Sequence, residues 1–292
     1  MVRGAVGDGG ADARASAHAH RRHPRAARLS VRAHGAARRD DRQPARARRV
    51  PGAAPLEPGG SRVKAFVLAG GLGTRLRPRF GDLPKGLAPV GGVPFLARLL
   101  AWLASHGVRD IVLCAGVGAE ALRDALGDGA AHGVRIAWSA EDSPLGTGGA
   151  LARAAAHVAG PALVVNGDTL PECDPWALER ARWERGAIGA VALFEVPDAT
   201  AHGRVECDAD GRVTRFVEKD PAWRGPAWVN GGLYAFSPVL WRRLPRGASS
   251  LERDTLAALA AQGGLVGLRC AGRFWDIGTP ESWAAAEARF AR

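Results

Sequence analysis

Lysine is scarce in this sequence. Only three of its 40 basic residues are lysines, at positions 64, 85 and 219. Because arginine is the default cation of this chain, a lysine indicates a place that needs a compact ammonium group on a thin stem. Lys85 and Lys219 both lie in short motifs with glycine or alternating charge, so we single them out as candidate chemical groups.

Cysteine is also rare, and long apolar runs are missing. The four cysteines lie at 114, 173, 207 and 270, with no C-x-x-C spacing and no histidine cluster beside them. Zinc coordination and a disulfide framework are therefore not indicated, and reduced thiols are expected. No run approaches the roughly 18 apolar residues of a membrane span, and no short apolar core with a cleavage site follows the N-terminal arginines. We expect a cytoplasmic protein with no membrane partner.

Aromatic residues are absent from residues 1–62, and so is apolar periodicity. This segment holds 14 arginines, no lysine and five acids, a net charge of +9, which leaves only +2 for residues 63–292. We expect residues 1–62 to be a disordered Arg/Ala-rich extension, and translation to begin near Val63, where a strand would start at once. The nearly neutral body argues against a nucleic acid partner, and an arginine-driven nucleic-acid binder acting through residues 1–62 is the alternative.

Short apolar strands alternate with helical segments from residue 63 onward. This pattern predicts one folded α/β domain over residues 63–292, with a mostly parallel mixed sheet flanked by helices. Strands are predicted at 63–68, 110–114, 134–138, 162–166 and 188–194, and helices near 94–105, 118–126, 147–157 and 175–185.

The pattern becomes β-rich after residue 195. A hairpin is predicted over 203–207 and 213–219 and a further strand over 229–236, followed by a helix near 251–261, a strand near 265–269 and a last helix from Pro280. We expect these strands to extend the sheet and to form the wall of the second half of a site.

A glycine-rich segment follows the first strand. Without side chains, glycines let backbone N–H groups approach a polyanion, and cations just beyond can neutralise it. The alternative is a tight corner between strand and helix, but the cations that follow favour a triphosphate cradle. The predicted cradle consists of Leu68, Gly70, Gly71, Gly73, Thr74, Arg75 and Lys85.

Two other glycine-rich phosphate loops do not match. A dinucleotide-binding fingerprint needs a third glycine where this chain has Leu76, and it needs an acid at the end of the next strand, 111–114, where none stands. A Walker A loop needs Gly-Lys-Ser/Thr, but in 81–87 Lys85 precedes the second glycine and no hydroxyl residue follows it.

Two aspartates follow apolar segments near predicted strand ends. Asp168 comes after the strand 162–166, and Asp276 lies between bulky apolar residues just before the last helix. Taken alone, an aspartate after a strand is usually a helix cap or a turn residue. If the two converge, they make an oxygen-only site suited to Mg²⁺, which binds one or two carboxylates together with substrate phosphates.

The strand that ends in Glu218 and Lys219 has alternating charge. On their own, these two residues would be a solvated surface ion pair. Beside a phosphate cradle, Lys219 can instead bind a second phosphate and Glu218 can accept hydrogen bonds from sugar hydroxyls.

Seven motifs together resemble the sugar-1-phosphate nucleotidyltransferases over about residues 63–292. They are GGLGTRL (70–76), PK (84–85), PLGTGGA (144–150), NGD (166–168), VEK (217–219), VNGG (229–232) and DIGTP (276–280). Within that family, DLPK (82–85), LGTGGAL (145–151) and SLERD (250–254) look most like the D-glycero-D-manno-heptose 1-phosphate guanylyltransferases, with mannose-1-phosphate guanylyltransferases a close second. The sequence departs at Gly86, where the family commonly has proline, and at Gly231, where it has alanine. We expect both changes to loosen a loop.

The resemblance implies a fold and a reaction. The fold is Rossmann-like, the nucleotide-diphospho-sugar transferase fold, with a β-rich acceptor half, and residues 63–292 are its catalytic domain. The reaction, of the EC 2.7.7 type, is attack of a sugar 1-phosphate on the α-phosphorus of a nucleoside triphosphate, with pyrophosphate leaving. Arg75 and Lys85 would neutralise phosphate charge, Asp168 and Asp276 would hold Mg²⁺, and the sugar phosphate would lie against Gly203, Glu218, Lys219 and Asn230.

The resemblance also implies a nucleotide and a sugar. Guanine presents donors that suit a carboxylate, so Glu141 or Asp142 before Pro144 is well placed, and Gly146, Gly148 and Gly149 indicate close backbone approach to base and ribose. GTP and the heptose 1-phosphate are the expected pair, and the product would supply a surface glycan. The alternatives are mannose 1-phosphate, glucose 1-phosphate with UTP or dTTP, and a nucleotide-sugar sensor without turnover.

Overall fold

The computed structural model describes residues 63–71, 73–200, 202–217 and 222–291. The predicted extension, residues 1–62, lies outside these ranges, as do Glu218 and Lys219. Within the described ranges, no helix has both the length and the apolar character that a membrane crossing requires.

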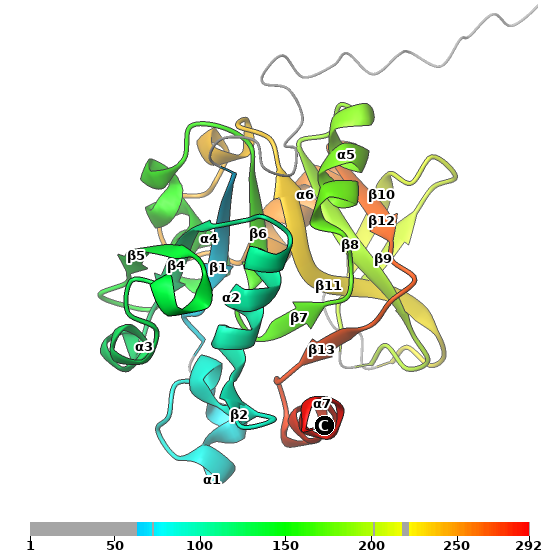
Figure 1. Cartoon of the computed structure of the whole chain (residues 1–292). Helices are drawn as coiled ribbons and strands as arrows, with labels where there is room; N and C mark the ends of the chain where they lie inside the picture. The colour runs from blue at the N-terminus through cyan, green and yellow to red at the C-terminus, as the bar shows by residue number, and fades with distance from the viewer. Residues whose placement is uncertain (1–62, 72, 201, 218–221, 292) are drawn as a thin grey trace, which may run out of the picture. The chain divides into compact units, whose positions relative to one another are not determined.

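A mixed sheet, nine-stranded within the described residues, carries the fold (Figure 1). Its strand order is β10-β9-β11-β6-β1-β4-β5, with β8 paired to β11 and β12 paired to β8. The bounds are β1 Lys64–Leu68, β4 Asp110–Ala115, β5 Arg135–Ala140, β6 Ala162–Asn166, β8 Gly189–Val196, β9 Arg204–Cys207, β10 Val213–Val217, β11 Ala227–Phe236 and β12 Leu265–Arg269. β1 runs parallel to β4 and β6, whereas β11 is antiparallel to β6 and opens the β-rich half. The predicted α/β fold is confirmed.

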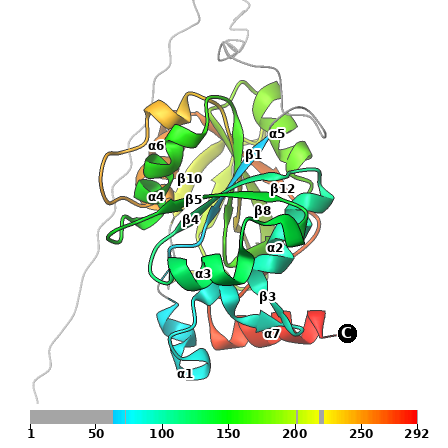
Figure 2. The ribbon, with the colours of Figure 1, turned by 60° about the vertical axis from the view of Figure 1, so that its left-hand side comes forward.

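Helices cover both faces of this sheet (Figure 2). β1 shows why: Ala65 and Val67 face one buried cluster, while Phe66 between them faces the other. A strand that is buried on both faces has a continuous apolar run, as residues 65–68 of β1 do. The first cluster takes side chains of α2 Phe95–Ser105, α3 Ala119–Leu126 and α5 Pro175–Glu184, and the second those of α4 Gly146–Ala154 and α6 Ala257–Ala261.

The sequence did not predict several short elements. β7 Thr169–Pro171 pairs antiparallel with β13 Phe274–Asp276, and β2 Pro89–Val90 pairs with β3 Val93–Pro94. Strands of two or three residues are too short to show an alternating pattern. The remaining short elements are α1 Arg77–Phe80, five 3-10 turns at Thr74–Leu76, Lys85–Leu87, Ala130–His132, Ala155–His157 and Leu240–Arg242, and a π-helical turn at Leu251–Leu256.

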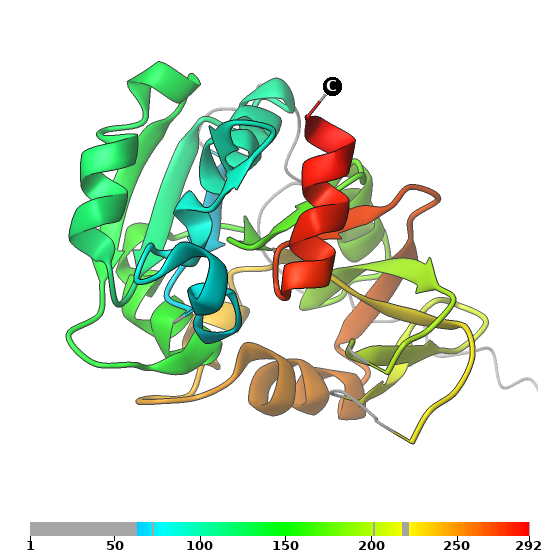
Figure 3. The same cartoon turned by 90° about the horizontal axis from the view of Figure 1, so that it is seen from below.

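The last helix, α7 Pro280–Phe290, packs against the β2–β3 segment (Figure 3). Thr279 caps its N-terminus in a capping box with Ser282. The indole Nε1 of Trp283 donates to Pro89 O at 2.8 Å, and the Gly91 N–H donates to Glu287 at 2.7 Å. β13 therefore leads into a helix that is capped at its N-terminus and held against the β2–β3 segment by two hydrogen bonds.

Cys173 and Cys270 form a disulfide, so the expectation that all four thiols are reduced is wrong. The two cysteines are 97 residues apart, and spacing rules do not detect such a pair. They meet because the chain beyond β7 lies beside the chain that enters β13, where the Glu172 N–H donates to Arg273 O at 2.7 Å. Cys114, which is buried in β4, and Cys207 are free.

Candidate active site

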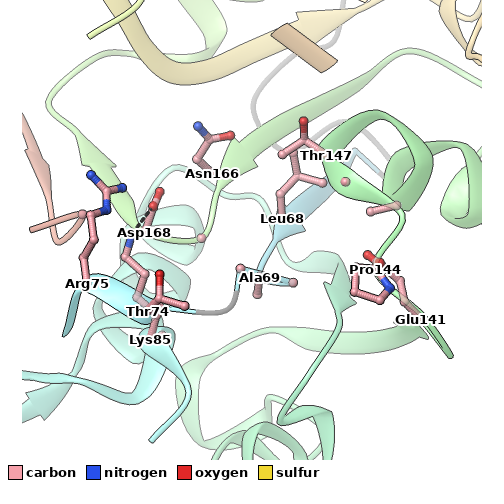
Figure 4. Close-up of a pocket in the computed structure, with 18 residues that line it drawn as sticks. Leu68, Ala69, Thr74, Arg75, Lys85, Glu141, Pro144, Thr147, Asn166 and Asp168 are labelled. Atoms are coloured by element: carbon pink, nitrogen blue, oxygen red, sulfur yellow. Dashed lines mark hydrogen bonds and ion pairs between the residues drawn. The ribbon is translucent and has the colours of Figure 1, made fainter. Parts of the chain in front are cut away.

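A cavity of about 440 Å³ lies beyond the carboxyl ends of β1, β5 and β6 (Figure 4). This edge is where open α/β sheets bind ligands. Ten of the residues predicted to bind nucleotide line the cavity, whereas Asp142, Gly148 and Gly149 do not. The lining residues are Leu68, Ala69, Gly70, Gly71, Gly73, Thr74, Arg75, Lys85, Gly86, Glu141, Pro144, Gly146, Thr147, Ala150, Asn166, Gly167, Asp168 and Gly278.

The glycine segment after β1 folds back onto two neighbouring segments. Gly73 has φ of +59°, and a Cβ there would lie 3.1 Å from the Cβ of Lys85. A Cβ on Gly70 would lie 3.1 Å from Glu141 Oε1 and 3.5 Å from Gly116 N. Glycine at both positions therefore brings the loop into direct contact with Lys85 and Glu141, as a phosphate cradle requires.

Lys85 and Asp168 form an ion pair in the cavity wall. The distance from Lys85 Nζ to Asp168 Oδ2 is 2.5 Å, and the Lys85 side chain is only 12% exposed. Burial alone would raise the pKa of the Asp168 carboxyl, but the Lys85 ammonium and the hydrogen bonds from Lys85 and Thr169 lower that pKa below its usual value. Asp168 is therefore ionised at neutral pH.

Asp276 lies next to this pair, as the sequence predicts. β13 places Asp276 opposite Thr169, and the Ile277 N–H donates to Asp168 O at 3.0 Å. The Asp276 carboxylate accepts the Gly278 N–H at 2.8 Å. A Cβ on Gly278 would lie 2.9 Å from Asp276 Oδ1, 3.6 Å from Arg75 Nη2 and 3.8 Å from Lys85 Nζ. The fold thus brings together the four residues that the sequence predicts to be catalytic.

Glu141 forms the opposite wall of the cavity. It directly follows β5, and its Oε2 accepts the Leu145 N–H at 2.8 Å, which fixes the turn that leads into α4. Asp142, the other candidate for base recognition, forms an ion pair with Arg153 at 3.0 Å and is 87% exposed at its side chain. Glu141 rather than Asp142 is therefore the carboxylate at the cavity.

The glycines of α4 pack against residues 247–251 of the same chain. A Cβ on Gly146 would lie 2.5 Å from Ser249 O, one on Gly148 2.7 Å from Ser249 Oγ, and one on Gly149 2.6 Å from Gly247 O. Gly146 in addition has φ of +69°. The predicted approach was to base and ribose, but the space beside these glycines is taken by residues 247–251 of this chain. Of the three, Gly146 lines the cavity, so close approach to the nucleotide stays a prediction for Gly146.

The predicted sugar-phosphate residues lie partly outside the described ranges. Of this set, Gly203 and Asn230 are described, and they meet where the Asn230 N–H donates to Gly203 O at 2.9 Å. The Asn230 amide donates to the Tyr234 hydroxyl at 2.7 Å and accepts the Gly232 N–H at 3.0 Å. Asn230 therefore shapes the bend of β11 and does not line the cavity.

The expectation that Gly86 and Gly231 loosen their loops is wrong. A Cβ on Gly86 would lie 2.3 Å from Leu96 Cδ1, and one on Gly231 would lie 2.3 Å from two ring atoms of Phe194. Both neighbouring side chains are buried core residues. Each glycine therefore makes room for a side chain that packs over it, and the backbone is held by that contact.

Asn166 and Thr147 are cavity residues to which the sequence analysis gave no role. Asn166 ends β6 directly opposite Leu68, and its Oδ1 is buried without a hydrogen-bond partner in the described part of the chain. Figure 4 shows its side chain above Asp168. The signal in the sequence was a polar residue closing an otherwise apolar strand.

Comparisons with known proteins find similar sequences over most of this chain. The family model described as Nucleotidyl transferase matches residues 64–292. A mannose-1-phosphate guanylyltransferase of Mycobacterium tuberculosis is 36% identical over 236 residues, which cover 79% of this chain and 65% of that protein. The mannose-1-phosphate guanylyltransferase catalytic subunit beta of Danio rerio is 31% identical over 76% of this chain and 62% of its own length. The chain thus spans less than two thirds of these curated relatives.

Two solved structures are similar to this chain along their full length. HddC from Yersinia pseudotuberculosis superposes with a TM-score of 0.71 at 32% identity, over 78% of this chain and 100% of that chain. The structure of HddC complexed with GMP-PN superposes with a TM-score of 0.69 at 30% identity over the same shares.

Proposed function

This chain belongs to the nucleotidyl transferase family, and on that premise we propose that it transfers a nucleotidyl group from a nucleoside triphosphate to a sugar 1-phosphate, releasing pyrophosphate. One observation carries the proposal. Arg75, Lys85 and Asp276 all approach one point beside Gly278, and Lys85 is bound to Asp168. Two cations and two carboxylates at the edge of a glycine-lined cavity suit phosphoryl chemistry.

The residues of this cluster have distinct tasks in the proposed reaction. An oxygen of the sugar phosphate forms a bond to the α-phosphorus, and the bond from that phosphorus to the pyrophosphate oxygen breaks. Such a displacement needs positioning and charge neutralisation and no protein nucleophile. The Lys85 ammonium, fixed by Asp168, is suited to the α-phosphate, and the Arg75 guanidinium to the departing pyrophosphate.

The two carboxylates fit Mg²⁺. Asp276 ends β13, and Asp168 directly precedes β7, the strand that pairs with β13. Each carboxylate is oriented by a hydrogen bond, from Thr169 and from the Gly278 N–H respectively. The described residues contain no cluster of three or more protein ligands, so phosphates and water would complete the coordination. When bound, the ion would neutralise charge on the reacting phosphates.

GTP is the nucleotide that the relatives favour. HddC has been solved with GMP-PN, and the curated relatives are guanylyltransferases. Glu141 supports the same choice, because its carboxylate can accept hydrogen bonds from the N1–H and N2–H₂ donors of guanine. We propose D-glycero-D-manno-heptose 1-phosphate as the acceptor, on the SLERD and double-glycine motifs, with mannose 1-phosphate second.

A substrate panel tests these proposals. GTP, ATP, UTP and dTTP are each combined with the 1-phosphates of mannose, glucose, N-acetylglucosamine and the heptose, and pyrophosphate release is measured in Mg²⁺. We expect GTP with the heptose 1-phosphate to give the highest kcat/KM. A preference for UTP or dTTP with glucose 1-phosphate would contradict the guanylyl assignment alone. No release with any pair, with nucleotide still bound, would contradict the proposed reaction and favour a sensor.

A further inference from the structure

Thr147 is the second residue of α4 and lines the cavity. Its hydroxyl has two partners from a segment more than 100 residues away. It donates to Glu252 Oε2 at 2.8 Å and accepts the Leu251 N–H at 2.8 Å. A hydroxyl has one proton to donate, so the proton of Thr147 is committed to Glu252, and the side chain that faces the cavity is fixed in orientation.

Residues 247–251 hold the N-terminus of α4 on either side of Thr147. Ser249 O accepts the Gly148 N–H at 2.9 Å, and the Ser249 N–H donates to Leu145 O at 2.8 Å. The first N–H groups of a helix need partners from outside the helix, and Ser249 O supplies one for Gly148. The start of α4 is therefore built jointly by the two segments.

Glu252 lies at the centre of the junction, the set of hydrogen bonds that joins the start of α4 to residues 247–252. It is half-buried, and its Oε2 also accepts the Ser250 hydroxyl at 3.1 Å, which in turn accepts the Arg253 N–H at 3.1 Å. Glu252 lies in the first turn of the π-helical segment Leu251–Leu256, whose two terminal leucines are fully buried. Short π-helical turns are rare and concentrate at functional sites.

The junction reaches the cavity wall through one further contact. Leu145, which accepts from Ser249, donates its own N–H to Glu141 Oε2 at 2.8 Å. Glu141, Pro144 and Thr147 all line the cavity. The position of this wall thus depends on the segment that Glu252 anchors.

We propose that Glu252 is a positioning residue for the nucleoside triphosphate. Through the Thr147 hydroxyl, Glu252 holds residues 141–147 of the cavity wall in the geometry that binds the nucleotide. The inference rests on the function proposed above. Glu252 does not line the cavity, so its effect on the ligand passes through Thr147. Binding, more than the chemical step, depends on it, because Lys85 and Asp168 belong to other segments.

The test compares Glu252→Ala, Thr147→Val and their combination with Glu252→Gln and Thr147→Ser, which keep an acceptor and a hydroxyl. Calorimetry gives the Kd for whichever of the four nucleoside triphosphates binds the unmodified chain most tightly in Mg²⁺. Steady-state rates give kcat and KM. Glu252→Ala and Thr147→Val should each raise Kd and nucleotide KM about tenfold, with kcat within about twofold. The conservative variants should stay near the unmodified chain, and the double variant should be no weaker than either single variant.

Glu287→Ala is the matched control. Glu287 is also half-buried and accepts a backbone N–H from a distant segment, Gly91 at 2.7 Å, but it lies away from the cavity. The Glu287→Ala variant should have a lower melting temperature than the unmodified chain but the same Kd for the nucleotide. The inference is overturned if Glu252→Ala behaves in the same way, or if the two single effects on Kd multiply in the double variant. A chain that binds nucleotide without turnover contradicts the proposed reaction only, and one that binds none of the four contradicts both.

Discussion

The ring of Phe194 occupies the space that a side chain at Gly231 would need, because a Cβ there would lie 2.3 Å from its Cδ2 and Cε2 atoms. Phe194 is 1% exposed and packs in turn against Phe274, at 5.4 Å between ring centroids. Phe274 begins β13, the strand that ends at Asp276. The Gly231–Phe194 contact therefore supports the strand that carries Asp276, one of the proposed catalytic residues.

Gly231→Ala should destabilise the fold. Gly231 is not a positive-φ glycine, so the cost is steric, and overpacking of this kind costs about 1–3 kcal/mol. Urea unfolding measures the change. Gly160→Ala is the control, since a Cβ there would meet nothing within 4 Å and the change should be neutral or stabilising. In a Phe194→Leu background the cost of Gly231→Ala should shrink, and an unchanged cost would contradict the assigned contact.

Arg182→Ala should be far more costly than the loss of a surface ion pair. Arg182 donates to both oxygens of Glu179 at 2.6 Å and to Ala187 O at 3.0 Å, and the Glu179 side chain is fully buried. Removing one partner of a buried pair costs about 3–5 kcal/mol. Arg135→Ala, which breaks the exposed pair with Asp110, should cost at most about 1 kcal/mol. Equal losses in urea unfolding would refute the distinction.

The sequence predicts what is encoded locally. β1, the glycines after it and the buried strands could be predicted because periodicity and turn residues are properties of a few consecutive positions. The β7–β13 pairing and the Cys173–Cys270 bond could not, since each joins segments about 100 residues apart. The structure also differs at Gly86 and Gly231, because Leu96 of α2 and Phe194 of β8 fill the space beside them, and the sequence pattern does not show packing between separate elements.

The Cys173–Cys270 disulfide should be detectable by thiol counting. In denaturant without reductant, only Cys114 and Cys207 should react with a thiol reagent, and all four cysteines should react after reduction. The disulfide should stabilise the native state by about 2–4 kcal/mol, largely by restricting the unfolded chain. Reduction should therefore lower the melting temperature of the unmodified chain but not of the Cys173→Ser variant. Four reactive thiols before reduction would contradict the bond.

Cys114 should make the protein less stable at alkaline pH. Burial, with a smaller contribution from the Glu141 carboxylate, raises the pKa of its thiol to about 12, whereas an unfolded cysteine has a pKa of about 8.5. Between these values the unfolded state binds fewer protons than the native state. The free energy of unfolding should then fall as pH rises, by up to about 1.4 kcal/mol per pH unit. In urea unfolding from pH 8 to 11, Cys114→Ala should show a shallower decline, and parallel curves would refute the shift.

Asp168→Asn should abolish most turnover while the fold persists. The substitution keeps the shape of the side chain but removes the charge that holds Lys85 at 2.5 Å and that is proposed to bind Mg²⁺. Loss of one preorganised charge-stabilising group typically costs about 10²–10³-fold in kcat, and excess Mg²⁺ should restore part of it if the weaker metal site is the cause. Pyrophosphate release measures the rate, and thermal unfolding shows whether the variant is folded.

Asp110→Asn is the control. It alters an ion-paired carboxylate at the opposite end of the parallel strands and should leave kcat unchanged. Near-normal turnover of Asp168→Asn would show that the Lys85–Asp168 pair is structural and that the metal assignment is wrong.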